Sequence, residues 1–169
     1  MHRFLHKLAR FSSGASPDDA GNMVQMLLTV PLDSAFDPII SSLIDRSKQV
    51  RAELRPWRRL PTALFQYRRG QLAGALHSID QDLAQTDAHA KTQAASTRAL
   101  ALFLKSAVNE KLGDRPSAVK AYKDGLQFHS PALRTPGIAY GGEDFWDACG
   151  AEIMRREAAT LLGAEAPTD

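Results

Sequence analysis

The 169-residue sequence contains one cysteine, Cys149, and this scarcity already excludes several kinds of site. A single cysteine rules out an internal disulfide and a cysteine-based zinc site, and it suits a reducing cytoplasm. No apolar run approaches the roughly 18 residues that a membrane span requires. The basic N-terminal segment also lacks the continuous apolar centre of a signal peptide. We therefore expect a cytoplasmic chain without a membrane span.

Motifs of common catalytic sites are missing as well. There is no glycine-rich phosphate loop, no GxSxG nucleophile motif, and no kinase catalytic-loop or magnesium motif. Cys149 and His129 are conceivable as nucleophile and base, but Cys149 shares an apolar helical stripe with Ile153, which favours a buried small hydrophobe. His2 and His6 have a metal-compatible spacing, yet no third ligand follows them. We expect no catalytic residue, no metal and no cofactor, and hence a protein that is not an enzyme.

The composition is that of an ordinary folded domain, with 44% hydrophobic and 24% charged residues. Within it, residues 98–128 carry two apolar stripes at helical spacing, separated by Gly113. Asp114 is a suitable cap for the second stripe, and Pro116 suits its first turn. This stretch therefore predicts a helical hairpin, and a hairpin of that size needs similar neighbours to bury its apolar faces.

A second stretch, residues 63–85, repeats the same pattern with an offset of 43 residues. Glycine lets the turn between two helices close, a small residue lets the helices approach, and a large apolar residue fills the space between repeats. The equivalent pairs are Gly70 and Gly113, Ala75 and Ala118, Ile79 and Tyr122, and Leu83 and Leu126.

This order of glycine, small residue and large apolar residue resembles the tetratricopeptide repeat, a helix-turn-helix unit of about 34 residues. Asp82 departs from the pattern, because it stands where a later small residue is expected. Residues 61–76 and 145–163 also resemble the last repeats of tetratricopeptide modules in large bacterial multidomain proteins, among them proteins with serine/threonine kinase domains. The resemblance covers about residues 23–163.

The resemblance implies an all-α fold, a tetratricopeptide-like right-handed α-solenoid of about three helical hairpins with a C-terminal capping helix. We expect a basic amphipathic N-terminal segment, a repeat domain and a frayed tail. These occupy residues 1–15, 16–163 and 164–169, with hairpins at about 17–50, 57–85 and 90–128 and the capping helix at about 143–162.

In that family the first helices of the repeats line a concave groove that takes a peptide or a partner protein. The resemblance therefore implies a non-catalytic scaffold or adaptor module. The equivalent residues here do not form the lysine and asparagine clamp that holds a terminal carboxylate in some relatives, so we do not expect that ligand. The expected groove residues are Leu64, Tyr67 and Arg68 from one repeat and Phe103, Ala107, Glu110 and Lys111 from the next.

Charge is distributed unevenly along the chain. Residues 46–69 hold eight basic side chains and Glu53 as the only acid, whereas residues 143–169 hold seven acids and two arginines. The basic segment suggests an alternative function, binding of nucleic acid or an acidic partner, although no RNA-binding signature accompanies it and a solvated surface is the simpler interpretation. Another alternative is a truncated remnant of a larger kinase-linked repeat protein. The basic patch would comprise Arg51, Arg55, Arg58, Arg59 and Arg69.

Overall fold

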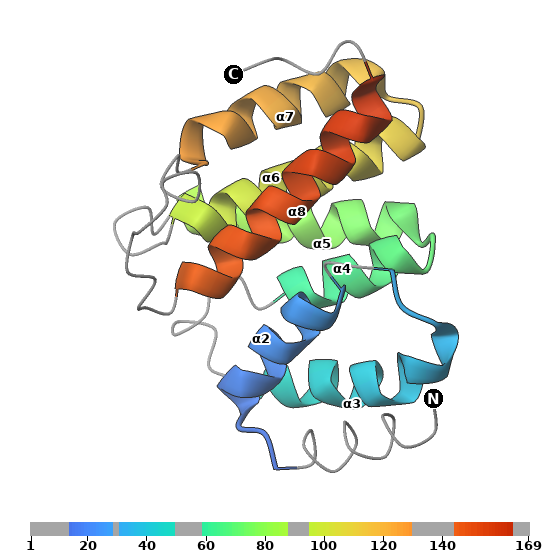
Figure 1. Cartoon of the computed structure of the whole chain (residues 1–169), viewed down its shortest axis with the longest axis vertical. Helices are drawn as coiled ribbons and strands as arrows, with labels where there is room; N and C mark the ends of the chain where they lie inside the picture. Colours follow the sequence, from blue (N-terminus) through green and yellow to red (C-terminus); the bar gives the residue numbers. More distant parts are fainter. Residues whose placement is uncertain (1–13, 29–30, 50–58, 88–94, 130–143, 164–169) are drawn as a thin grey trace.

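The described residues form seven α-helices and one short 3₁₀ helix, with no strand among them, so the predicted all-α class is confirmed for this part of the chain. The computed structural model describes residues 14–28, 31–49, 59–87, 95–129 and 144–163. Figure 1 shows successive helices packed as three pairs, followed by a long final helix. The elements are α2 (Pro17–Leu28), η1 (Ser34–Phe36), α3 (Asp37–Ser47), α4 (Leu60–Arg68), α5 (Leu72–Asp87), α6 (Ala95–Lys111), α7 (Arg115–Phe128) and α8 (Asp144–Leu162).

Some predicted features lie outside the described residues. These are the basic N-terminal segment as far as residue 13, the tail 164–169, and Arg51, Arg55 and Arg58 of the basic patch. Among the helices that are described, none combines the length and the apolar character that a membrane crossing needs.

The two glycines that the repeat pattern aligned occupy the same kind of turn. Gly70 and Gly113 both have a positive φ, 73° and 82°, a conformation that glycine adopts without steric cost. After each glycine the next amide donates back five residues, from Gln71 to Gln66 at 2.8 Å and from Asp114 to Asn109 at 2.9 Å. This six-to-one hydrogen bond is the Schellman ending of a helix. Both hairpins therefore turn by one mechanism.

The residues aligned after these turns are also buried alike. Ala75 and Ala118 are both 0% exposed, and the large residues that follow them, Ile79 and Tyr122, are both 1% exposed. Helix α6 lies at the centre of the core, because it contacts α4, α5, α7 and α8. Eleven of its seventeen residues are buried, as expected for a helix that has neighbours on several sides.

Replacing Ala118 by leucine should lower the free energy of unfolding by about 1–3 kcal/mol, because added volume has no room in a packed core. Ala73 is the matched control, since it is exposed on the paired helix α5 and its replacement by leucine should change stability by no more than about 0.5 kcal/mol. Urea denaturation of both variants measures the difference. Equal midpoints would show that the repeat alignment assigns the wrong face.

Two helical glycines give a second matched pair. A Cβ at Gly125 would lie 2.8 Å from the ring of Phe103, which is fully buried between Tyr122 and His129. A Cβ at Gly74 would meet only the end of the Gln66 side chain, at 3.0 Å.

We therefore expect Gly125→Ala to lower the free energy of unfolding by about 1–3 kcal/mol through overpacking. Gly74→Ala should be neutral or should raise it by up to about 1 kcal/mol, because alanine is the better helix former. Thermal unfolding of the two variants measures this difference in stability. A stabilised Gly125→Ala protein would mean that Phe103 can move aside.

Helix α8 does more than cover the last hairpin. In Figure 1 it runs diagonally across α6, and it contacts α6, α7 and also α2, a member of the first helix pair. In an open solenoid each repeat contacts only its neighbours. Helix α8 thus returns over the first helices of the pairs, and the right-handed solenoid remains a prediction.

Candidate functional site

Two predicted groove residues donate hydrogen bonds to one carboxylate of α8, and a third lies over the ring of one of them. Tyr67 Oη donates a hydrogen bond to Glu157 Oε1 at 2.6 Å, and Arg68 Nη1 donates to the same oxygen at 2.8 Å. Lys111 Nζ lies 4.3 Å from the centroid of the Tyr67 ring, a cation–π distance. We call Tyr67, Arg68 and Lys111 together with this carboxylate the Glu157 site.

The site is assembled from the ends of three helices. Tyr67 and Arg68 are consecutive residues in the last turn of α4, and Lys111 ends α6. A cation in the last turn of a helix interacts favourably with the helix dipole. Arg68 also donates from Nε to the carbonyl oxygen of Leu28, at the end of α2, at 2.7 Å. The guanidinium is therefore oriented by α2 as well as by α8.

Burial makes these polar contacts strong. The side chain of Arg68 is only 5% exposed and that of Glu157 is 26% exposed. Burial alone would raise the pKa of Glu157, but the hydrogen bonds from Arg68 and Tyr67 outweigh it and hold this pKa below its ordinary value. Burial, and then the hydrogen bond to Glu157, raise the pKa of Tyr67. The site thus keeps a protonated phenol and a guanidinium directed at a carboxylate.

The other predicted groove residues lie elsewhere. Leu64, Phe103 and Ala107 are each 0% exposed, and they belong to the core cluster. The Phe103 ring faces α7, where its centroid lies 5.4 Å from that of Tyr122. Glu110 pairs with Arg115 at 2.5 Å and does not reach the Glu157 site in this structure. Of the seven predicted groove residues, three therefore lie at the Glu157 site, three lie in the core and Glu110 lies elsewhere.

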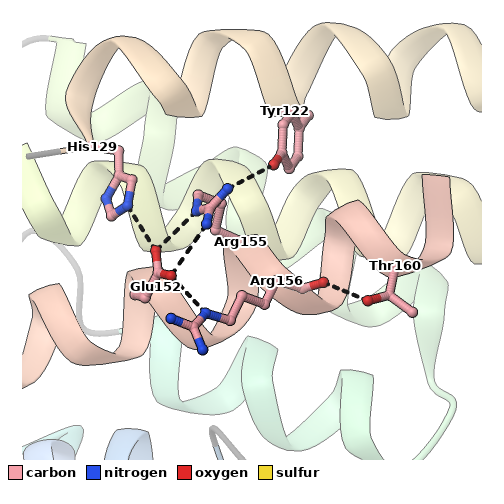
Figure 2. Close-up of polar contacts among 6 residues, drawn as sticks. All are labelled: Tyr122, His129, Glu152, Arg155, Arg156 and Thr160. Carbon is pink, nitrogen blue, oxygen red and sulfur yellow. Dashed lines mark hydrogen bonds and ion pairs between the residues drawn. The ribbon is translucent and has the colours of Figure 1, made fainter. Parts of the chain in front are cut away.

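A second carboxylate on α8, Glu152, lies in a dense cluster with the end of α7 (Figure 2). His129 Nε2 is 2.9 Å from its Oε2, Arg155 Nε reaches the same oxygen at 2.9 Å, and Arg156 Nε reaches Oε1 at 2.6 Å. Arg155 Nη1 also lies 3.4 Å from the hydroxyl of Tyr122. The cluster fixes α8 to α7.

The charges and pKa values in this cluster favour a structural role over a catalytic one. The hydrogen bonds from Arg155, foremost, lower the pKa of Glu152 to about 2, so this carboxylate is a poor proton acceptor near neutral pH. The His129 side chain is 5% exposed and directs Nε2 at Glu152. Cys149 is half-buried, and burial raises the pKa of its thiol, which disfavours the reactive thiolate. Within the described residues, no three His, Cys, Asp or Glu side chains are placed to hold a metal ion.

The described residues of the basic patch are paired with carboxylates. Arg59 lies 3.5 Å from Asp82, which is 0% exposed, and its backbone N–H donates to Asp82 Oδ2 at 3.0 Å. Arg69 pairs with Asp37 and also donates to the carbonyl of Leu32 at 3.1 Å. Burial raises the pKa of Asp82 to about 7, and the nearby Arg59 charge only partly offsets this. Both arginines therefore hold helices together.

Three important acids, Glu157, Glu152 and Asp82, were not among the predicted site residues. A signal for Glu157 was present in the sequence, since Arg68 belongs to the basic segment and Glu157 to the acidic one. Segments of opposite charge attract each other, which favours a contact between them. Comparison of the chain with protein-family models, with curated proteins and with solved structures finds no match.

Proposed function

We propose that this chain is a non-catalytic, cytoplasmic scaffold module of the tetratricopeptide type that binds a helix of a partner protein across α2, α4 and α6. The observation that carries the proposal is the Glu157 site, where Tyr67 and Arg68 donate to one carboxylate of a helix and Lys111 lies over the Tyr67 ring. Helix-in-groove recognition uses such contacts, with an apolar face below and anchoring polar residues beside it. In this structure α8 occupies the position of the ligand.

The stripe that α8 buries indicates which helices fit this face. Its buried residues lie at helical spacing and alternate between small and large. Small residues allow close approach of two helices, and the larger ones fill the remaining space. A partner helix would need this stripe and an acid beside it. The stripe comprises Ala151, Met154, Ala158 and Leu162.

We do not extend the proposal to nucleic acid. Arg59 and Arg69 each face a carboxylate of this chain, so their charge is partly neutralised before any phosphate arrives.

The test is a pull-down with the full chain as bait in three forms. Glu157→Gln weakens the hold on α8 and should increase capture of the partner. Adding Lys111→Glu to that variant places an acid at the site, repels the acid of the partner helix and should reverse the increase. Lys111 is exposed, so its replacement should leave the fold intact. Asp124→Asn is the matched control, because Asp124 pairs with Lys120 on α7 at 2.6 Å in a surface contact. Equal capture by all three forms would refute the proposal.

A further inference from the structure

Helix α8 is held along its length by polar contacts at intervals of about one and a half turns. Besides the Glu152 cluster and the Glu157 site, contacts form near both of its ends. Asp147 accepts a hydrogen bond from Thr97 of α6, and Arg115 of α7 donates to the carbonyl of Leu162 at 2.6 Å. Every partner in these contacts except Arg155 and Arg156 lies outside α8, so they fix its position on the body of the protein.

The apolar contribution of α8 is modest by comparison. Two of the four fully buried hydrophobic side chains on its stripe are alanines, Ala151 and Ala158. Apolar stabilisation scales with buried area, so an alanine contributes less than a leucine or methionine. The large side chain of Ile153 is 38% exposed. The hold on α8 therefore depends strongly on matched charges, above all at the Glu157 site.

The residues that surround Glu157 at this site belong to helices other than α8. Leu28 of α2 orients Arg68, and the Arg68 guanidinium carbon also lies 5.1 Å from the centroid of the Tyr67 ring. The Arg68 side chain is 5% exposed, and a carboxylate is the group that a buried guanidinium binds most strongly. The site therefore requires an acid, but nothing in its chemistry requires that the acid belong to the same chain.

The same helix can reach the site from another copy. Residues 130–143 connect α7 to α8 in the sequence. A chain of that length can span up to about 50 Å, more than the diameter of a small domain. A second copy carries an identical α8 and would form an identical set of contacts. Exchange of an identical element between two copies is a low-cost route to a dimer.

We propose that α8 is an exchangeable helix, and that two copies of this chain associate when Glu157 of each enters the Tyr67, Arg68 and Lys111 site of the other. This inference rests on the proposed function, since it assumes that the face formed by α2, α4 and α6 takes a helix as a ligand. It names the partner as a second copy of the chain. Connection in one chain gives the resident α8 a high effective concentration, so exchange should increase with protein concentration.

The test exchanges the charges of the pair between two full-length variants. Arg68→Glu places two acids together within one chain, and Glu157→Arg places two bases together. In a mixture, exchange of α8 restores an opposite pair at both sites. The new acid at position 68 then meets the new arginine at position 157, and Arg68 of the other chain meets an unchanged Glu157. We expect the mixture to contain at least about ten times more dimer than either variant alone, since like charges disfavour the wrong partner. Native mass spectrometry and light scattering measure this.

Two controls keep the test decisive if a single variant folds poorly. The chain that carries both Arg68→Glu and Glu157→Arg has a matched pair within one chain, so it should fold and stay mainly monomeric at the concentration at which the mixture dimerises. Wild-type chains with two different affinity tags, unfolded together and refolded at high concentration, should yield dimers that carry both tags. A mixture that stays monomeric while the double variant folds would overturn the inference, and so would the lack of doubly tagged wild-type dimer.

The two proposals can fail separately. If Glu157→Gln increases capture of a partner while neither dimer forms, the face binds a helix but α8 is not exchanged. If the dimers form and no variant changes capture, exchange of α8 is supported and binding of a different protein is refuted.

Discussion

Glu157→Leu should lower the free energy of unfolding by about 3–5 kcal/mol, the cost of breaking a buried ion pair by removing one of its members. The Arg68 side chain is 5% exposed and donates to Glu157 at 2.8 Å, and Tyr67 donates to the same oxygen. The leucine removes both acceptors at once. Because Glu157 is 26% exposed, water can reach part of the space, and we expect a value at the lower end of the range.

Urea denaturation measures this loss, and two further variants interpret it. Asp124→Leu removes an acid from a surface pair on α7 and should cost no more than about 1 kcal/mol. Combining Arg68→Met with Glu157→Leu should restore part of the stability, because no buried charge then lacks a partner. A Glu157→Leu protein as stable as the Asp124→Leu control would show that the Glu157 site contributes nothing to the fold.

Asp82 should make the protein less stable as the pH rises from about 4 to about 7. Burial raises the pKa of Asp82 from its ordinary 3.8 to about 7 in the folded state. In that pH range the unfolded chain releases the proton and the folded chain retains it, so each increase in pH stabilises the unfolded state relative to the folded state. Each pKa unit corresponds to about 1.4 kcal/mol, which sets an upper limit of about 4 kcal/mol for the effect.

Asp82→Asn removes the titrating group while it keeps an acceptor for the backbone N–H of Arg59. Wild type and variant should have similar stability near pH 4, and the variant should be the more stable of the two at pH 8. Asp80→Asn is the matched control, because Asp80 lies on the same helix and pairs with Lys105 in a half-exposed contact. Parallel stability curves for wild type and Asp82→Asn would contradict the prediction. Glu152, with a pKa of about 2, changes the stability of the protein only at more acidic pH, where it takes up its proton.

The local architecture was predictable from the sequence because it depends on local patterns. Gly70 and Gly113 mark two turns of one kind, and Ala75 and Ala118 mark the two places where helices pack closely. Glycine tolerates a positive φ and alanine permits close packing wherever they occur, so these residues carry their meaning without a tertiary context. Pro61 likewise lies in the first turn of α4, where proline is tolerated.

The candidate site was predictable only in part, since it depends on a contact distant in the sequence. Helical spacing shows that Tyr67 and Phe103 lie on apolar faces, but it does not show which helix covers each face. Phe103 packs on α7, whereas Tyr67 meets α8. Asp82 departs from the repeat pattern, and the reason is a tertiary contact: its carboxylate accepts a hydrogen bond from the backbone at the start of α4. Helical spacing gives no sign of that contact.

The contact between Tyr67 and Glu157 joins residues that are 90 positions apart, and this separation has a consequence during synthesis. The ribosome adds about 5–20 residues per second, so α8 is completed roughly 2–7 seconds after α7. Tyr67, Arg68 and Lys111 are therefore synthesised before the Glu157 of the same chain. On a message read by several ribosomes, the first Glu157 to reach a waiting site can therefore belong to a neighbouring nascent chain.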